Sequence, residues 1–315
     1  MQYLLLALTS TIIGCLAVDA EPGESEAVGS VTSCPPEQQS GLWCIETAPT
    51  TGLLHGVWAV TASDVFAVGD SGTILRRTND TWTAMTSGTT NNLRGVWAAS
   101  STDVWAVGSN ATILHFDGSQ WSPVSGAGTT VPVDAVWGSS ANDVWMCGGN
   151  RCVRWNGQSL TTHALVGTIL SVSGTGPNDV WVSGENANPK HWNGSTWTSV
   201  NPGSGLSNYP AMLAISATDV WAAATVPGKE TMHLEAGRWV ARTTSAAFLN
   251  EMSALAANDI WGAANSGKVT HWNGTSWTTE SPTNNNTSIA LYSVTTLPGD
   301  AWVVGGSGWI AHRPL

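Results

Sequence analysis

The chain has 315 residues, of which 42% are hydrophobic and only 10% are charged. Its 11 Lys and Arg residues are outnumbered by 22 Asp and Glu residues, and the formal net charge is −11. So few cations cannot neutralise a run of phosphates, so we expect no nucleic-acid partner and no electrostatic docking on anionic lipid. The chain also contains no run of 18 apolar residues that would span a bilayer.

The first 14 residues predict a signal peptide. The stretch from Tyr3 to Gly14 is apolar, and the tetrapeptide that ends at Cys15 resembles the bacterial lipobox, in which the cysteine is lipidated. We therefore expect a lipid anchor on Cys15, a flexible acidic tether over residues 15–40, and a lipoprotein at the bacterial cell surface or outer membrane. The alternative is an ordinary signal peptide that is cleaved near Ala20, which predicts a secreted protein.

The four remaining cysteines predict two disulfide bonds, as expected in an oxidising compartment. Cys147 and Cys152 bracket a predicted tight turn and can be joined across it. Cys34 and Cys44 then form the second pair near the start of the fold. No second close pair of Cys or His accompanies them, so we expect no metal and no cofactor.

A short motif of Asp, an apolar residue and an aromatic residue recurs at intervals of 36 to 41 residues. Its seven copies begin at Asp64, Asp103, Asp143, Asp179, Asp219, Asp259 and Asp300. Around the second copy, turn residues separate four β-type runs, at 93–99, 104–108, 112–116 and from Trp121 onward. The sequence therefore predicts an all-β fold in which residues 41–315 form a seven-bladed β-propeller with four antiparallel strands per blade.

The phase of the repeat predicts how the ring closes. The seventh copy ends after its third strand, while residues 41–45 form an unmatched fourth strand at the other end of the propeller region. Trp43 precedes Trp58 by the same distance as Trp82 precedes Trp97. We therefore expect the N-terminal strand to complete the last blade, which leaves no exposed sheet edge.

The hairpins that end at Trp121, Trp197 and Trp277 resemble those of Asp-box, or BNR-like, propellers, including photosystem assembly factors and bacterial surface lipoproteins. These hairpins lack the leading Ser of an Asp-box and usually carry Asn in place of its Asp. The resemblance covers residues 41–315 and implies the fold. It implies no particular activity, because propellers carry enzymes, lectins and scaffolds alike.

Two sets of residues repeat in register and are expected to be structural. Eighteen of the 19 Trp residues, all except Trp309, lie at repeated strand positions that suit packing between blades. A basic residue also recurs near the end of each third strand, where we expect it to hydrogen-bond to the repeat aspartate. These basic residues are Arg76, His115, Arg154, His191, His233, His271 and His312.

No catalytic motif is recognisable, so we expect a non-enzymatic protein. The irregular loops lie between the second and third strands of a blade and between successive blades, which places them on one face of the ring. Function is usually carried by such loops. Our candidate ligand-binding residues on this face are Glu185, Asn186, Tyr209, Lys229 and Glu230.

The predicted function is non-catalytic recognition of an extracellular glycan or an envelope protein by a monomer. One alternative is a hydrolase or lyase that acts on a polysaccharide at the same face. The other is a structural envelope scaffold.

Overall fold

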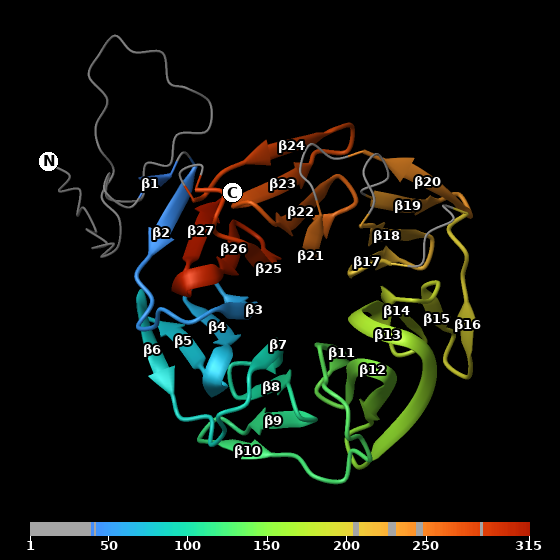
Figure 1. Cartoon of the computed structure of the whole chain (residues 1–315), viewed down its shortest axis with the longest axis horizontal. Coiled ribbons are helices and arrows are strands. Elements are labelled where there is room, and N and C mark those ends of the chain that lie inside the picture. Colours follow the sequence, from blue (N-terminus) through green and yellow to red (C-terminus); the bar gives the residue numbers. More distant parts are fainter. Residues whose placement is uncertain (1–38, 41, 204–207, 226–230, 244–247, 284–285) are drawn as a thin grey trace, which may run out of the picture.

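A computed structural model describes residues 39–40, 42–203, 208–225, 231–243, 248–283 and 286–315. The predicted signal peptide, most of the predicted tether with Cys15 and Cys34, and the loop residues Lys229 and Glu230 lie outside these ranges. No helix within them is both long and apolar enough to cross a membrane. The described chain is all-β, and its sheets stand side by side around a central axis as in a β-propeller (Figure 1).

Four of the sheets contain four antiparallel strands each, as the repeat predicts. They are formed by β3 (Leu54–Thr61), β4 (Asp64–Gly69), β5 (Ile74–Thr78) and β6 (Thr81–Met85); by β7 (Leu93–Ser100), β8 (Asp103–Gly108), β9 (Thr112–Phe116) and β10 (Trp121–Pro123); by β17 (Ala211–Ser216), β18 (Asp219–Ala223), β19 (Thr231–Glu235) and β20 (Arg238–Arg242); and by β21 (Leu249–Ala256), β22 (Asp259–Ala264), β23 (Lys268–Trp272) and β24 (Trp277–Glu280).

The prediction of seven separate four-stranded blades is wrong, because the described strands form six sheets. The third and fourth repeats share one sheet of six strands instead of forming two sheets. Its strands are β11 (Ala135–Ser140), β12 (Asp143–Trp155), β13 (Leu160–Gly176), β14 (Asp179–Glu185), β15 (Lys190–Trp192) and β16 (Trp197–Ser199).

The length of the third repeat accounts for this merger. Asp143 and Asp179 are 36 residues apart (179 − 143), the shortest interval in the chain, so no irregular loop separates the two repeats. Strand β13 instead runs on for 17 residues and pairs with β12 in its first part and with β14 in its second. A continuous strand thus replaces the connection that the other repeats make by a loop.

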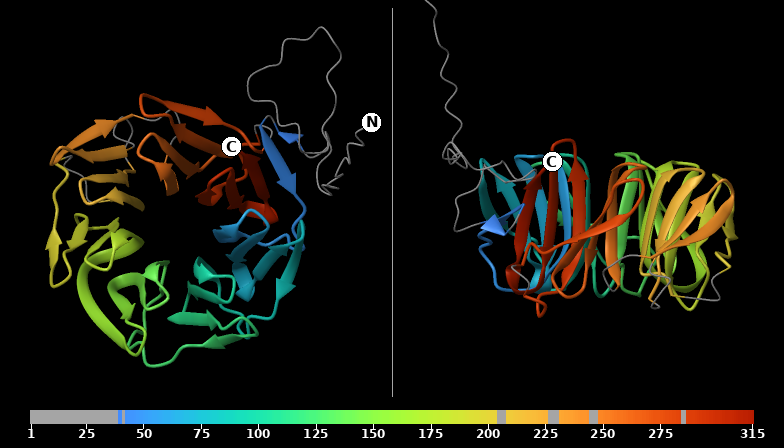
Figure 2. Two further views of the ribbon diagram at one scale, coloured as in Figure 1. Left: turned by 180° about the vertical axis from the view of Figure 1, so that it is seen from behind. Right: turned by 90° about the horizontal axis from the view of Figure 1, so that it is seen from above.

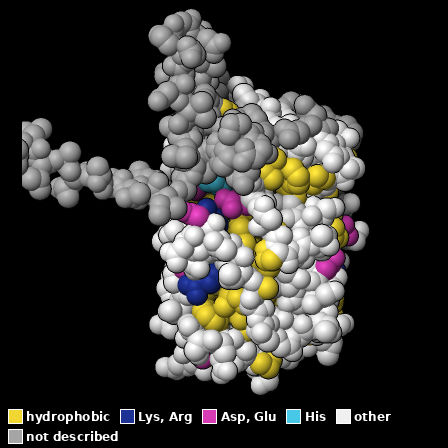
Figure 3. Space-filling model, turned by 90° about the vertical axis from the view of Figure 1, so that its left-hand side faces the viewer, with side chains coloured by type: hydrophobic (Ala, Val, Ile, Leu, Met, Phe, Trp, Pro, Cys, Tyr) yellow, Lys and Arg dark blue, Asp and Glu magenta, His cyan; other side chains and the backbone are white. Residues whose placement is uncertain are grey.

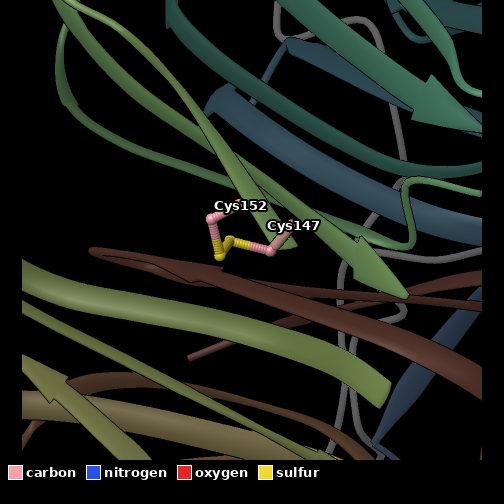
Figure 4. The surroundings of a disulfide bond; sticks show 2 residues. All are labelled: Cys147 and Cys152. Carbon is pink, nitrogen blue, oxygen red and sulfur yellow. A yellow bond between two sulfur atoms is a disulfide. The ribbon is translucent and has the colours of Figure 1, made fainter. Parts of the chain in front are cut away.

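Strand β12 contains a turn, which a disulfide bond holds. Cys147 and Cys152 are bonded, and their Cα atoms are 4.1 Å apart (Figure 4). Five steps of extended strand would span about 16 Å, so the chain folds back between the two cysteines. Gly149 adopts a positive φ of 51° at this turn. The element therefore covers both the second and the third strand of its repeat.

The sixth sheet joins the two ends of the described chain. Its strands, in spatial order, are β1 (Gln39–Ser40), β2 (Trp43–Glu46), β27 (Ile310–Pro314), β26 (Asp300–Gly305) and β25 (Leu291–Leu297). In the β2–β27 pair, Cys44 lies opposite His312 and Glu46 lies opposite Ile310. Closure of the last repeat by the N-terminal strand is therefore confirmed, and Figure 2 shows β2 in blue beside the red C-terminal strands.

Two short 3-10 turns connect the second and third strands of the first and last repeats. They are η2 (Asp70–Gly72) and η3 (Gly306–Gly308). The turns between third and fourth strands share another device, in which an Asp or Asn side chain accepts hydrogen bonds from the two backbone N–H groups that follow. Asp117 binds the N–H groups of Ser119 and Gln120, and Asn273 binds those of Thr275 and Ser276. These polar turns fix the hairpins that the sequence repeats.

Indole rings fill the space between neighbouring sheets. The Trp of a fourth strand packs edge-on against the Trp in the second strand of the preceding sheet. The ring centroids of Trp43 and Trp261 are 5.9 Å apart, and those of Trp277 and Trp221 are 5.6 Å apart. Edge-to-face aromatic pairs add to the burial energy of the contact. On the outer side of the ring near β2 and β6, most of the surface carries no charged side chains (Figure 3).

Candidate functional site

In all seven repeats the basic residue of the third strand contacts the repeat aspartate. The contact distances range from 2.6 to 3.3 Å, and the pairs are Arg76–Asp64, His115–Asp103, Arg154–Asp143, His191–Asp179, His233–Asp219, His271–Asp259 and His312–Asp300. Because the pairs are spread around the ring, one in each repeat, they do not converge on one reacting centre. Contacts that are dispersed in this way agree with the hypothesis that the pairs are structural.

The same basic groups also stack on the aromatic residue of their own second strand. His233 is 4.0 Å from Trp221 between ring centroids, and the guanidinium of Arg76 is 4.9 Å from the Phe66 ring. Burial disfavours the charged form of Asp64, but hydrogen bonds from Arg76 and Ser101 and the charge of Arg76 outweigh it and lower its pKa. Each pair thus connects the end of a hairpin to the aromatic rings that pack between sheets.

Of the five predicted ligand-binding residues the structure describes three, and it brings their loops together: Asn186 N donates to Asn208 Oδ1 at 3.2 Å, and Tyr209 N donates to Gly184 O at 2.7 Å. Glu185 is exposed at the end of β14, and Asn186 follows it with a positive φ of 59°. Tyr209 is 0% exposed and packs with Trp181 and Met212, so its prediction as a surface contact is wrong. Lys229 and Glu230 lie outside the described residues. None of the described members of this set lines the central cavity.

That cavity lies at the centre of the ring and has a volume of about 570 Å³. It is lined by residues at the start of the innermost strands β3, β7, β11, β21 and β25, by Pro210 directly before β17, by the middle of β13, and by Asp70 in η2. Figure 1 shows these strands facing the central axis. Since the innermost strands start at the cavity, it belongs to the face that carries the connections between repeats. The candidate ligand-binding residues from the sequence were expected on the same face, but they are other residues than those that line the cavity.

One position of the repeat supplies a side chain to the cavity from every repeat. It directly follows the buried residue at or beside the start of the innermost strand, as His55 follows Leu54 and as Pro210 follows Tyr209. The seven residues at this position, which we call the channel ring, are His55, Arg94, Asp134, Leu170, Pro210, Asn250 and Tyr292.

Alternation along a strand explains the ring, because neighbouring side chains point to opposite sides. Leu54, Leu93 and Leu249 are each 0% exposed in the core, so the next side chain in each strand points into the channel. Tyr209 takes the same core position in its repeat, which explains its burial. The sequence carries a usable signal here, because this position holds seven different residue types while most of the repeat is monotonous.

Two pairs of polar side chains contact each other in the channel. His55 Nε2 lies 2.8 Å from Asp70 Oδ1, and Arg94 Nη1 lies 2.5 Å from Asp134 Oδ1. The ring of Tyr292 tilts against that of His55, with centroids 5.3 Å apart. The channel therefore offers polar groups and one aromatic ring, and the guanidinium of Arg94 already lies beside a carboxylate.

Glu251 also lines the cavity, next to Asn250 of the channel ring. Burial raises its pKa to about 7, although hydrogen bonds from Ser293 and from the backbone N–H of Val294 act in the opposite direction. Its Oε2 atom is 3.3 Å from Val294 N. At neutral pH this carboxyl group is thus close to the midpoint of its titration.

Side chains from neighbouring sheets cap backbone N–H groups along the inner strands. Ser293 Oγ accepts a hydrogen bond from Val57 N at 3.0 Å, and Ser173 Oγ accepts one from Ala214 N at 3.0 Å. Ser253 Oγ receives the N–H of Thr296 at 3.1 Å. These bonds tie the inner strands of successive sheets together and occupy donors that an open edge would leave free.

Solved structures with the same architecture cover most of the chain. YCF48 bound to D1 peptide has a TM-score of 0.71 at 14% identity and covers 96% of this chain and 99% of its own; YCF48 from Cyanidioschyzon merolae has a TM-score of 0.69 at 16% identity over 87% and 98%. The virginiamycin B lyase from Staphylococcus aureus has a TM-score of 0.73 at 14% identity over 87% of this chain and 98% of its own. No protein-family model and no curated protein matches the chain.

These likenesses define the class of the fold, which is an all-β β-propeller. At such identities they establish the architecture alone.

Proposed function

We propose that this protein is a non-catalytic binding module that recognises a glycan or a protein at the central channel. The observation that carries the proposal is the channel ring. A repeat that is nearly uniform elsewhere presents seven different side chains around one cavity of about 570 Å³, a size typical of ligand sites.

Two further observations support binding as the role of this face. The polar groups of the channel come together from separate sheets. The repeated pairs of an aspartate and a basic residue, in contrast, are spread around the ring. A solved neighbour, YCF48, is bound to a peptide, so a protein ligand is compatible with this fold.

Screening of the full chain on an array of glycans and against a phage-displayed library of 12-residue peptides tests this proposal. Any ligand found should lose affinity at least tenfold in the Arg94→Met variant. The matched control is Arg238→Met, because Arg238 is exposed on the outermost strand β20. Ligands that bind both variants equally would place recognition elsewhere, and a chain that binds no probe would contradict a binding role.

The place of action that we propose is the bacterial cell surface, with Cys15 as the lipid-modified residue. The support is the sequence of residues 1–15 together with the low charge of the chain. Expression with radiolabelled palmitate in a bacterial host should label the wild type and not Cys15→Ser. A secreted, unlabelled wild type would favour cleavage near Ala20.

A hydrolase or lyase is the second candidate, because Glu251 combines a position in the cavity with a pKa raised to about 7. A carboxyl group that titrates near neutral pH is suited to general acid or base catalysis. Turnover of a polysaccharide that disappears in Glu251→Gln, with binding retained, would establish this activity against our first proposal.

A further inference from the structure

Two polar side chains of the channel ring are already paired within the protein. His55 is beside Asp70, and Arg94 is beside Asp134, whose side chain is only 9% exposed. An anionic ligand would have to compete with Asp134 for Arg94, in a cavity that the carboxyl groups of Asp70 and Glu251 also line. A neutral ligand can bind while both pairs stay intact, so the arrangement favours a neutral one.

The Arg94–Asp134 pair keeps unused bonding capacity. The contact uses one guanidinium N–H and one carboxylate oxygen, while the Arg94 side chain is 46% exposed. A guanidinium has five N–H donors, and a carboxylate has a second oxygen that accepts. Two adjacent hydroxyl groups match this pair, because one can accept from Arg94 while the other donates to Asp134.

Around the channel ring, an aromatic residue lies two positions from Arg94, with His55 between them. Tyr292 is part-exposed and contacts His55, which comes from β3, the strand next to β7 with Arg94. The face of an aromatic ring is apolar, and its hydroxyl group is polar. The channel thus combines a stacking surface with bidentate hydrogen bonding, while Leu170 and Pro210 supply apolar contacts.

The inner strand edges are poorly suited to an added peptide strand. The N–H groups of Val57, Ala214 and Thr296 already donate to serine side chains of neighbouring sheets. Addition of a strand depends on free backbone donors and acceptors at an edge. A ligand that bonds through hydroxyl groups does not need them.

We propose that the channel binds a neutral sugar ring, with one face of the sugar against Tyr292 and vicinal hydroxyl groups bonded to Arg94 and Asp134. This inference rests on the proposed binding function and names the ligand class. Glu251 lines the same cavity and adds a further polar group to it.

Isothermal titration of the full chain with cellobiose, maltose, lactose and N,N′-diacetylchitobiose tests the inference, with 3′-sialyllactose and digalacturonate as charged probes. At least one neutral sugar should bind more tightly than both charged probes. Tyr292→Ala and Arg94→Met should each weaken that sugar at least tenfold, while Tyr292→Phe and the control Arg238→Met should stay within threefold of wild type. Thermal unfolding of each variant shows that the fold is kept.

Three results would overturn the sugar inference. They are binding of charged probes alone, binding of a neutral sugar that Tyr292→Ala and Arg94→Met leave unchanged, and the absence of sugar binding. In the last case the phage-displayed peptides separate the two proposals. A peptide that requires Arg94 would preserve the binding function and exclude the sugar, and no binding of either kind would remove both.

Discussion

Arg77 forms an ion pair with Glu46 across the join between the first and the last repeat. Its Nη2 atom is 3.2 Å from Glu46 Oε1, and the two side chains are 7% and 16% exposed. The guanidinium also lies 4.8 Å from the centre of the Trp302 ring. Arg313 is placed in the same way on the other side of the closing sheet, between Glu280 and Trp261.

Removal of one partner should weaken ring closure. Loss of one member of a buried ion pair costs about 3–5 kcal/mol where the remaining charge has no other partner. Here Asp80 also contacts Arg77 at 2.9 Å and His312 lies 3.4 Å from Glu46, so we expect Arg77→Met and Glu46→Gln each to lower the free energy of unfolding by only about 1–2 kcal/mol in urea titrations. The double variant should be more stable than the sum of the two losses implies, by about 0.5–1 kcal/mol. Additive losses would show that the pair does not act as a unit.

The aspartate–histidine pairs should also be energetically coupled. Asp259 accepts hydrogen bonds from Trp261 Nε1 at 2.9 Å and meets His271 Nε2 at 2.8 Å. Both side chains are partly exposed, so we expect Asp259→Ala and His271→Ala to cost only about 1 kcal/mol each. Urea unfolding of the two single variants and the double variant should give a coupling of at least about 0.5 kcal/mol. A coupling near zero would leave the repeated pairs without a role in stability.

Asp64 should make the fold sensitive to acid. Its pKa is lower in the folded state than its ordinary value of 3.8, so the stabilisation is present above that value. It is lost as the pH falls through the lower folded pKa. The difference in unfolding free energy between wild type and Asp64→Asn should therefore be largest at pH 5–7 and shrink below pH 4. A difference that is constant down to pH 2 would contradict this assignment.

Glu251 should have the opposite effect. Its pKa rises from 4.5 to about 7 on folding, so the folded state holds the proton more tightly than the unfolded chain. The wild type should lose stability as the pH rises from 4.5 to 7, by at most about 3 kcal/mol. Glu251→Gln, which has no proton to lose, should lack this decline in unfolding titrations at pH 5, 6, 7 and 8. A parallel decline in the variant would point to another group.

The disulfide bond of β12 should contribute a modest stabilisation. The two cysteines are five positions apart, and closure of so short a loop removes about 2 kcal/mol of entropy from the unfolded chain. Cys147→Ala/Cys152→Ala should therefore unfold at a lower urea concentration than wild type. The difference between the two urea midpoints should narrow in dithiothreitol, because the reductant breaks the bond in the wild type and the variant has no such bond to lose. Equal midpoints without reductant would show that the bond has no stabilising effect.

The sequence predicted the features that depend on repetition. The position of Trp43 relative to Trp58 placed β2 beside β27, and the register of the repeat aspartates placed a basic residue near each of them. Both inferences need only the spacing of one repeat compared with the next. Spacing is preserved wherever strands keep their register.

The candidate site was harder to predict, because the selection of loop residues ignored the alternation within strands. Tyr209 stands out as a large residue in an irregular loop, yet its register equals that of Leu54, and both are buried. Applied to all repeats, the same comparison would have identified Arg94 and Tyr292 as channel residues. The merger of two repeats in one sheet is subtler, because it depends on a few missing residues between Asp143 and Asp179.

The pairing of β2 with β27 gives synthesis and folding a fixed order. Residues 43–46 leave the ribosome early, but their neighbours at 310–314 are made more than 260 residues later. Contacts between such distant segments form slowly. Strand β2 therefore cannot pair with β27 until nearly the whole polypeptide has been made, and the closing sheet forms last.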